Sequence, residues 1–293
     1  MAKRINRAIE LLEADQAIYY DGPHTGHVLT YEQGRKDVAT WADYINVGME
    51  HGAFDMTGLA EYMRGLVDGG PTASGHRTPT VIVEAPVNGI DAPTVAYNAW
   101  QFRQILGRGV HGILLCQAES ADAVAEFVRA CRFPHHKAGI DKIGVGSRGR
   151  GSEPTAAPVW GIDQQTYFAR CEPWPLDPAG ELLLGVKIES PVGVERCEEI
   201  LAVPGLGFAE LGPGDLGLAL GYTSLQRRPY PPEMERARSR VFSACKWNRL
   251  AFLEGATPAT ITASLDEGVR VIAGHDPETA RVGRDHQKRT MAT

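Results

Sequence analysis

Short apolar runs alternate with amphipathic stretches along most of the chain. Runs of apolar and β-branched residues predict strands, which we place at 17–20, 44–47, 80–85, 112–116, 142–146, 183–189, 208–212, 250–255 and 269–274. In residues 120–132, apolar side chains recur at the spacing of one helix face, and Ser120 is suited to cap the start of that helix. Further helices are predicted over 190–202, 257–268 and 276–287.

This alternation predicts an α/β fold. Near-continuous apolar strands between helices are typical of a parallel sheet that is covered on both faces. With the run at 142–146 omitted, the remaining strands match a (β/α)8 TIM barrel, a single domain over residues 1–293 with a helical segment from about 276. Residues 147–181 are polar, contain proline and are too long for an ordinary connection, so we expect a lid or an oligomer contact there.

Composition excludes several classes of function. A net charge of −6 argues against a nucleic-acid partner, because phosphate binding needs clustered lysine and arginine. No apolar run approaches the roughly 20 residues that span a bilayer, and the charged N-terminal stretch lacks the apolar core of a signal peptide. The five cysteines are scattered and form no C-x-x-C pair, as in reduced cytoplasmic proteins. We therefore expect a cytoplasmic protein that acts on small molecules.

Two acidic residues stand at the ends of apolar runs. Glu189 ends "LLGVKIE", and Asp215 follows "FAELG" in the loop "GPGD". The carboxyl ends of barrel strands face the active site, so both side chains are expected in one mouth. Neighbouring carboxylates raise each other's pKa unless a cation lies between them, and Mg²⁺ or Mn²⁺ suits such oxygen ligands. Alternatively, Asp215 caps a short helix and Glu189 pairs with a basic residue.

Residues 185–222, "GVKIESPVGVERCEEILAVPGLGFAELGPGDLGLALGY", resemble the metal-site segment of the HpcH/HpaI family of class II pyruvate aldolases. That segment has a strand ending in Q-[IV]-E-[TS], followed by a helix, a strand and G-P-x-D-L. Residues 47–66, which contain "EHGAFD", are similar to the family's D-x-E-H motif, and residues 109–147 are similar to its central part. The family includes 2,4-dihydroxyhept-2-ene-1,7-dioate aldolase and macrophomate synthase.

The resemblance implies a TIM-barrel lyase (an aldehyde-lyase) that depends on a divalent metal. Glu189 and Asp215 would hold Mg²⁺ or Mn²⁺, which would bind a 2-oxo acid such as pyruvate and stabilise its enolate. His51, which stands at the family's E-H pair, would be the base that takes a proton from the aldol hydroxyl.

The resemblance also implies how the substrates bind. The backbone around Gly212, Pro213 and Gly214 would bind the substrate carboxylate, and Gln117 falls at a position in the loop after the fourth strand where some members have a histidine. The partners would be a 2-oxo acid and an aldehyde. The protein would be a homo-oligomer, a trimer or a hexamer, with C-terminal helices exchanged between subunits.

The sequence departs from the family pattern at strand ends. Gly48 stands where the family has an aspartate that orients the histidine, Glu84 replaces an arginine, and Lys187 replaces a glutamine. Glu84 is a candidate acid/base or a selector for a donor group on the substrate. Lys187 is a candidate Schiff-base amine, or it neutralises Glu84 or Glu189 across the barrel.

Three further interpretations remain open. The same barrel could act as a metal-dependent decarboxylase, as an enzyme that adds an enolate to another acceptor, or as a protein that binds an oxo acid without turnover.

The stretch "HTGH", with His24 and His27, follows the first strand and could reach the barrel mouth, but H-x-x-H alone is a weak metal motif.

Overall fold

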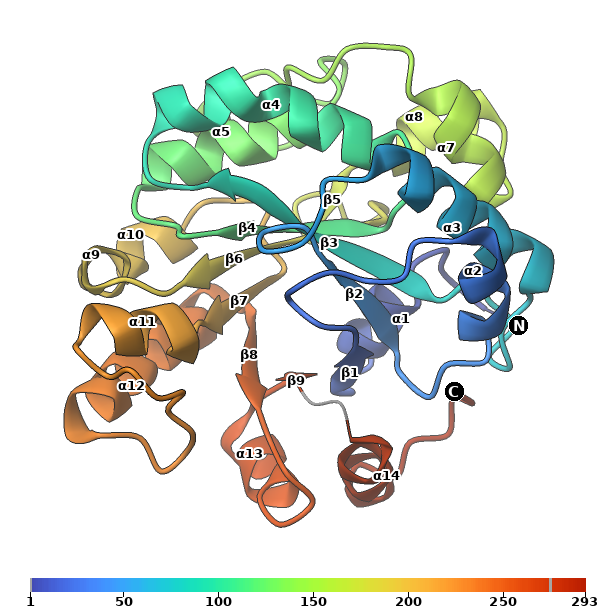
Figure 1. The fold of residues 1–293 in the computed structure, drawn as a ribbon. Helices are drawn as coiled ribbons and strands as arrows, with labels where there is room; N and C mark the ends of the chain where they lie inside the picture. The colour runs from blue at the N-terminus through green and yellow to red at the C-terminus, as the bar shows by residue number, and fades with distance from the viewer. Residues whose placement is uncertain (1, 274–275) are drawn as a thin grey trace.

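The computed structural model describes residues 2–273 and 276–293. Parallel strands form a closed barrel, because β1 pairs with both β2 and β9 and β4 pairs directly with β6. The predicted (β/α)8 TIM barrel is therefore confirmed (Figure 1). Its strands are β1 (Ile18–Asp21), β2 (Tyr44–Gly48), β3 (Thr80–Asn88), β4 (Gly112–Cys116), β6 (Leu182–Ile188), β7 (Phe208–Leu211), β8 (Ala251–Gly255) and β9 (Val271–Ala273).

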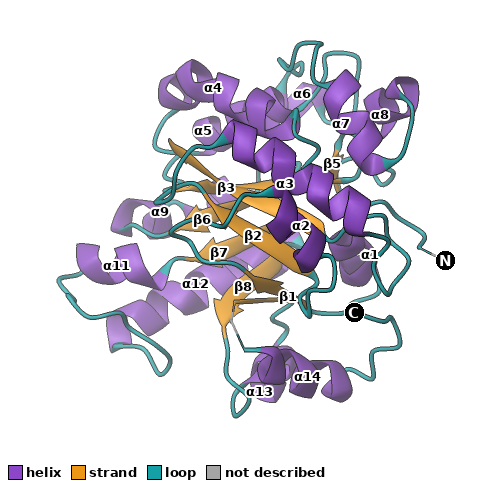
Figure 2. Ribbon diagram, turned by 45° about the vertical axis from the view of Figure 1, so that its right-hand side comes forward, coloured by secondary structure: helices purple, strands orange, loops and turns teal. Residues whose placement is uncertain are grey.

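Helices surround these strands on the outside of the barrel, except α1, which packs against the side chains of the barrel interior (Figure 2). In the part of the chain that the structure describes, no helix is long and apolar enough to cross a lipid bilayer. The helices are α1 (Arg7–Glu13), α2 (Tyr31–Asp37), α3 (Met56–Gly69), α4 (Ala92–Leu106), α5 (Ala121–Cys131), α6 (Ile140–Ile143), α7 (Glu153–Trp160), α8 (Gln164–Arg170), α9 (Pro191–Glu195), α10 (Cys197–Leu201), α11 (Pro213–Ala219), α12 (Pro232–Asn248), α13 (Ile261–Glu267) and α14 (Pro277–His286).

Local signals in the sequence account for most of these boundaries. The helix predicted over 120–132 is α5, and the Ser120 hydroxyl accepts a hydrogen bond from the Ala123 N–H as its cap. The run at 142–146 forms the end of α6 and a loop, so it was right to omit it from the barrel. The helix predicted over 190–202 is divided at Arg196 into α9 and α10.

Residues 147–181 pack near the amino-terminal ends of the strands. They form α7, α8 and the two-residue strand β5 (Pro173–Trp174), which pairs with the start of β6. The Trp160 indole N–H donates to the Gly109 carbonyl (2.9 Å) and the Thr155 hydroxyl donates to the Gly107 carbonyl (2.7 Å), just before β4. In Figure 1, α7 and α8 lie at the upper right, whereas α9 and α11, which follow strand ends, lie at the left. This position does not fit a lid over the barrel mouth.

The barrel interior changes from apolar to charged along the strands. Apolar side chains fill the part of the interior nearer the amino-terminal ends of the strands. This layer includes Ile18, Tyr20, Tyr44, Ile82, Leu114, Leu183, Phe208, Leu253 and Val271. Side chains alternate between the two faces of a strand, so residues two positions further along also point inward. That alternation takes Ile82 to Glu84 and Phe208 to Glu210, both of which are buried. The carboxyl ends of the strands thus carry an ionisable layer above an apolar plug.

Residues from near both ends of the described chain meet at Asp43, which directly precedes β2. Asp43 is buried and forms ion pairs with Arg7 (2.8 Å), Arg284 (3.3 Å) and Arg289 (2.7 Å). Arg284 also donates to the Trp41 carbonyl (2.7 Å). The helix predicted over 276–287 is α14, and these contacts hold it against its own barrel.

Candidate active site

Gln117 links the two carboxylates that the sequence singled out. Glu189 directly follows β6 and Asp215 lies in the first turn of α11. The backbone N–H of Gln117 donates to Glu189 Oε1 (2.8 Å), and its side-chain Nε2 donates to Asp215 Oδ2 (2.8 Å). Gln117 has a φ of +50°, in the left-handed region that few residues with a side chain adopt. In this conformation, Gln117 orients both acids.

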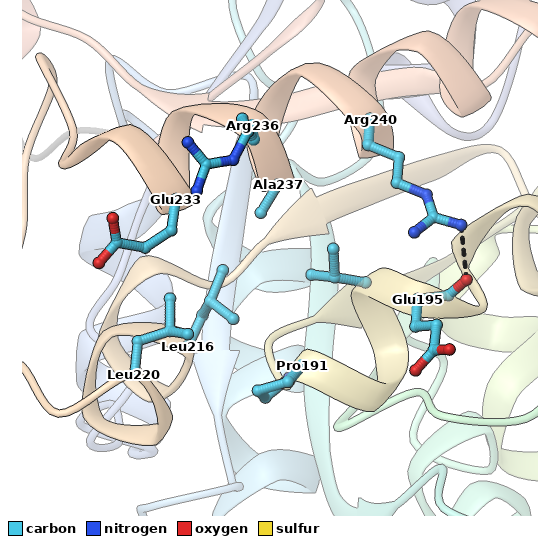
Figure 3. A pocket seen from close by; sticks show the side chains of 9 residues that line it. Pro191, Glu195, Leu216, Leu220, Glu233, Arg236, Ala237 and Arg240 are labelled. Carbon is cyan, nitrogen blue, oxygen red and sulfur yellow. Dashed lines mark hydrogen bonds between the residues drawn. The ribbon is translucent and has the colours of Figure 1, made fainter.

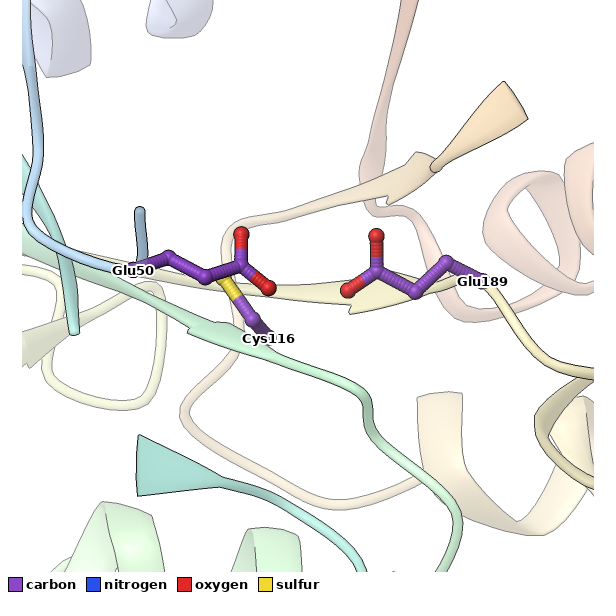
Figure 4. Close-up of side chains that lie close together, drawn as sticks. All are labelled: Glu50, Cys116 and Glu189. Atoms are coloured by element: carbon purple, nitrogen blue, oxygen red, sulfur yellow. The ribbon is translucent and has the colours of Figure 1, made fainter. Parts of the chain in front are cut away.

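Glu50 is a third carboxylate at the same place, and the sequence interpretation missed it. Ligand atoms of Glu50, Cys116 and Glu189 lie within 4.8 Å of one another, as do those of Glu50, His51 and Asp215. Figure 4 shows the carboxylates of Glu50 and Glu189 pointing toward each other, with the Cys116 sulfur beside Glu50. Glu50 therefore lies close to both predicted metal ligands.

Lys187 is the ammonium group of this cluster. Its Nζ lies 2.8 Å from Glu50 Oε2, 3.9 Å from Glu84 Oε1 and 4.0 Å from Glu189 Oε2. Lys187 was expected to neutralise Glu84 or Glu189; it lies near both, while its nearest partner is Glu50. Burial would lower the pKa of Lys187, but the acidic groups around it outweigh burial and raise that pKa. A Schiff base needs a neutral amine, so this setting does not favour that role.

The cluster carries more negative charge than Lys187 balances. Burial, aided by Glu50, raises the pKa of Glu189 to about 8, although Lys187 opposes this shift. Burial likewise raises the pKa of Glu210, two positions beyond Phe208, to about 7. Glu210 Oε2 is buried and has no hydrogen-bond partner among the residues that the structure describes. A group of crowded, buried carboxylate oxygens is the donor set that fits a divalent cation.

The turn at Gly212, Pro213 and Gly214 offers fewer amide donors than expected. The Gly212 N–H donates to the Ile188 carbonyl (3.0 Å) within the sheet, and proline has no N–H. The N–H groups of Gly214 and Asp215 remain, in the first turn of α11, where helical N–H groups lack intrahelical partners.

His51 lies at the rim of the cluster. Its side chain is 53% exposed, and its Nε2 lies 3.7 Å from Glu50 Oε2. That distance exceeds a hydrogen bond, and the same Glu50 oxygen already accepts from Lys187. The carboxylate partner that would orient His51 is therefore engaged elsewhere.

A second histidine, His24, has such a partner. His24 Nδ1 lies 2.6 Å from Glu84 Oε1, and its Nε2 lies 3.3 Å from the Tyr20 hydroxyl. Burial would raise the pKa of Glu84, but the hydrogen bond from His24 and the nearby Lys187 hold that pKa below its ordinary value. The hydrogen bond to Glu84 in turn raises the pKa of His24. His27, the other histidine of "HTGH", contacts Asp37 instead (3.0 Å).

Two close backbone approaches fix the loop that carries His24. A Cβ on Gly48 would lie 2.2 Å from the His24 carbonyl oxygen and 2.6 Å from its Cα. Gly22 has a φ of +119°, and a Cβ there would lie 2.1 Å from the Asn46 carbonyl oxygen. Glycine at both positions lets the loop after β1 lie against β2. Gly48 stands where the family pattern has an aspartate. Because Gly48 has no side chain, the backbone of His24 can lie against it.

A groove of about 280 Å³ lies outside the barrel, between α9, α11 and α12 (Figure 3). Apolar side chains, including Val194, Leu216 and Leu220, form most of its walls, with charged residues such as Glu233 and Arg236 around them. It contains none of the clustered carboxylates of the barrel mouth.

The sequence profile of the HpcH/HpaI aldolase/citrate lyase family matches residues 82–269. The chain belongs to this family. Among its relatives, a hydroxypyruvate/pyruvate aldolase from Roseobacter denitrificans is 25% identical over 231 residues, which cover 79% of this chain and 76% of that protein.

Solved structures of HpcH/HpaI family proteins share the fold. One from Burkholderia cenocepacia has a TM-score of 0.69 at 21% identity, with 96% of each chain covered. The citrate lyase β subunit from M. tuberculosis, in complex with oxaloacetate and magnesium, has a TM-score of 0.53 at 14% identity, with 94% of this chain and 98% of that one covered.

Proposed function

We propose that this chain is a divalent-metal-dependent carbon–carbon lyase that breaks or forms an aldol bond beside a 2-oxo acid. The observation that carries the proposal is the grouping of Glu50, Glu189 and Asp215 at one barrel mouth, with Gln117 bonded to two of them. Membership of the family and the aldolase named in R. denitrificans support a lyase.

The donor atoms favour Mg²⁺ or Mn²⁺ as the ion. Glu189 and Asp215 would hold it, with Glu50 close to both, and carboxylate oxygens suit these hard cations. The buried thiol of Cys116 suits softer metals and is the least fitting member of the cluster. A bound Mg²⁺ or Mn²⁺ supplies Lewis-acid stabilisation of the negative charge that develops on the 2-oxo oxygen. The magnesium complex of the M. tuberculosis protein supports this assignment by analogy.

The protein's own groups would supply binding and charge balance. The N–H groups of Gly214 and Asp215, in the first turn of α11, would bind the carboxylate of the oxo acid. Lys187 keeps its proton and holds Glu50 in position, so we assign it a role in charge balance rather than in a covalent intermediate. The co-substrate of the condensation, or the second product of cleavage, would be an aldehyde.

Pyruvate release tests this function. The purified chain would be given a panel of 4-hydroxy-2-oxo acids and oxaloacetate, with Mg²⁺, with Mn²⁺ and after EDTA, and release would be followed through lactate dehydrogenase. We expect release from a 4-hydroxy-2-oxo acid that EDTA and Glu189→Ala each reduce by about 100-fold or more.

Glu199→Ala is the matched control, because Glu199 is an exposed glutamate of α10 that forms a surface ion pair with Arg196 (2.6 Å). This variant should keep parental activity. Release from oxaloacetate alone would instead indicate a decarboxylase. Release that is unchanged by EDTA and by Glu189→Ala would refute the metal-dependent lyase.

A further inference from the structure

We propose that His24, positioned by Glu84, is the proton-transfer residue of this active site. The inference rests on the proposed lyase function and names the residue that exchanges a proton with the substrate. His24 comes from the loop after β1, and Glu84 lies on β3 at the mouth of the barrel.

The hydrogen bonds assign the two ring nitrogens of His24. Glu84 is buried with a lowered pKa, so it is a carboxylate that can only accept a hydrogen bond. Nδ1 must therefore carry the proton of the 2.6 Å bond to Glu84 Oε1. In the neutral imidazole this leaves Nε2 as the basic nitrogen, with the Tyr20 hydroxyl 3.3 Å away. A carboxylate that fixes the tautomer and stabilises the imidazolium is the arrangement that makes histidine an effective base.

The position of His24 suits the distal part of an aldol substrate. In the barrel, β1 and β6 lie on opposite sides, so the loop that carries His24 and the strand end that carries Glu189 lie across the mouth from each other. Lys187 lies between the two sides, 3.9 Å from Glu84 and 4.0 Å from Glu189. The His24 side chain is 39% exposed, while Glu84 beneath it is 1% exposed. The imidazole is thus open to a substrate whose 2-oxo acid end lies at Glu189.

His51, the base expected from the sequence, lacks these features. Its nearest carboxylate is 3.7 Å away and is bonded to Lys187 at 2.8 Å. By contrast, His24 has a dedicated partner and two glycines, Gly22 and Gly48, that make room for its loop. The hydrogen bond to Glu84 and the space left by the two glycines thus fix the position of His24, whereas the carboxylate nearest to His51 lies beyond hydrogen-bond distance.

The proposed step is balanced as follows. The proton of the 4-hydroxyl passes to His24 Nε2 while the C3–C4 bond breaks. The bonding electrons go to C3 and spread onto the 2-oxo oxygen, and C4 leaves as an aldehyde. Return of the proton from His24 to C3 gives the 2-oxo acid and restores the neutral imidazole. Condensation follows the same path in reverse.

Four variants of the 293-residue chain test this role, each loaded with Mn²⁺: His24→Gln, Glu84→Gln, His51→Gln and Thr25→Ala. Thr25 is exposed and adjacent to His24, so Thr25→Ala controls for changes to the loop. We expect His24→Gln to lower kcat by about 100-fold, with KM changed by less than roughly threefold. His51→Gln should cause a smaller loss, and Thr25→Ala should match the parent. Binding of Mn²⁺, measured by calorimetry, should be unchanged by His24→Gln.

The pH profile separates a positioning role of Glu84 from a merely structural one. Glu84 from β3, Glu210 from β7 and Lys187 from β6 act on the charge of His24. The Tyr20 hydroxyl from β1 lies 3.3 Å from its Nε2. Because Glu84 stabilises the imidazolium, Glu84→Gln should move the acid limb of kcat/KM to lower pH. A structural role would reduce activity without moving this limb.

Each outcome decides a different point. Parental kcat in His24→Gln, or a larger loss in His51→Gln, would overturn the role of His24 and leave the lyase function intact. A parent that releases no pyruvate, or a Glu189→Ala variant with full activity, would refute the lyase function and the proton-transfer role with it.

Discussion

A methyl group at position 48 should displace the loop that carries His24. In Gly48→Ala, the new Cβ would lie 2.2 Å from the His24 carbonyl oxygen and 2.4 Å from its carbonyl carbon. Both atoms belong to the backbone, so no side-chain rotation relieves the contact and the loop must move by about 1 Å. The 2.6 Å bond between His24 and Glu84 depends on the loop's position and should be lost.

The expected cost combines two terms. Overpacking in a tight site costs about 1–3 kcal/mol, and a charge-assisted hydrogen bond contributes about 1.5–3 kcal/mol. His24 is partly exposed, and the loop can detach rather than strain the barrel. We therefore expect Gly48→Ala to lower the free energy of unfolding by about 2–4 kcal/mol in total. Activity should fall nearly as far as in His24→Gln, since the imidazole would no longer be held at the mouth.

Urea unfolding and pyruvate release would measure the two effects on the same protein. Gly149→Ala is the matched control, because a Cβ on Gly149 would meet no atom of residues 2–273 and 276–293 within 4 Å. This control should change stability by less than about 0.5 kcal/mol. If Gly48→Ala had parental stability and parental activity, the close approach of the His24 loop to β2 would be wrong.

Two other variants test parts of the structure that the activity assays do not reach. Gln117→Ala should weaken Mn²⁺ binding by about 10- to 100-fold, because Gln117 orients both predicted ligands; calorimetry with unchanged affinity would contradict this. Asp43→Asn should lower the free energy of unfolding at pH 7 by about 3–5 kcal/mol, since it leaves three arginines around a buried neutral group. Burial would raise the pKa of Asp43, but these arginines lower it in the folded chain. The stabilisation is thus present above the ordinary aspartate pKa of about 3.9 and is lost as the pH falls through the lower folded-state value. Urea unfolding of parent and variant should differ less at pH 3 than at pH 7, and an equal difference at both would refute the assignment.

The fold and part of the site could be predicted from local patterns. Apolar strands between helices indicated the barrel, and each strand end points to the same mouth. Glu189 and Asp215 stood out because each carboxylate follows an apolar run. Glu50 and Glu210 were within reach of the same reasoning. In "YINVGME", alternation from Tyr44 brings Glu50 inward, and in "FAELG" it brings Glu210 inward beyond Phe208.

The role of His24 could not be predicted in this way. It depends on the path of a loop that lies against another strand, and that path is set by two backbone contacts far apart in sequence. Gly48 was interpreted as the loss of a carboxylate, whereas the structure shows that its missing side chain makes room for the loop. The location of residues 147–181 was also out of reach, because connection length does not indicate which end of the barrel a segment covers.

The most direct test of the central claim is a titration of the metal-free protein with Mn²⁺. Bound Mn²⁺ and pyruvate release from the best 4-hydroxy-2-oxo acid would be measured on the same samples, beside Glu189→Ala. We predict that activity rises in proportion to bound Mn²⁺ and saturates at one ion per chain, while the variant neither binds the ion at these concentrations nor releases pyruvate. Full activity before any Mn²⁺ is added, or an active Glu189→Ala variant, would contradict a metal-dependent lyase at this site.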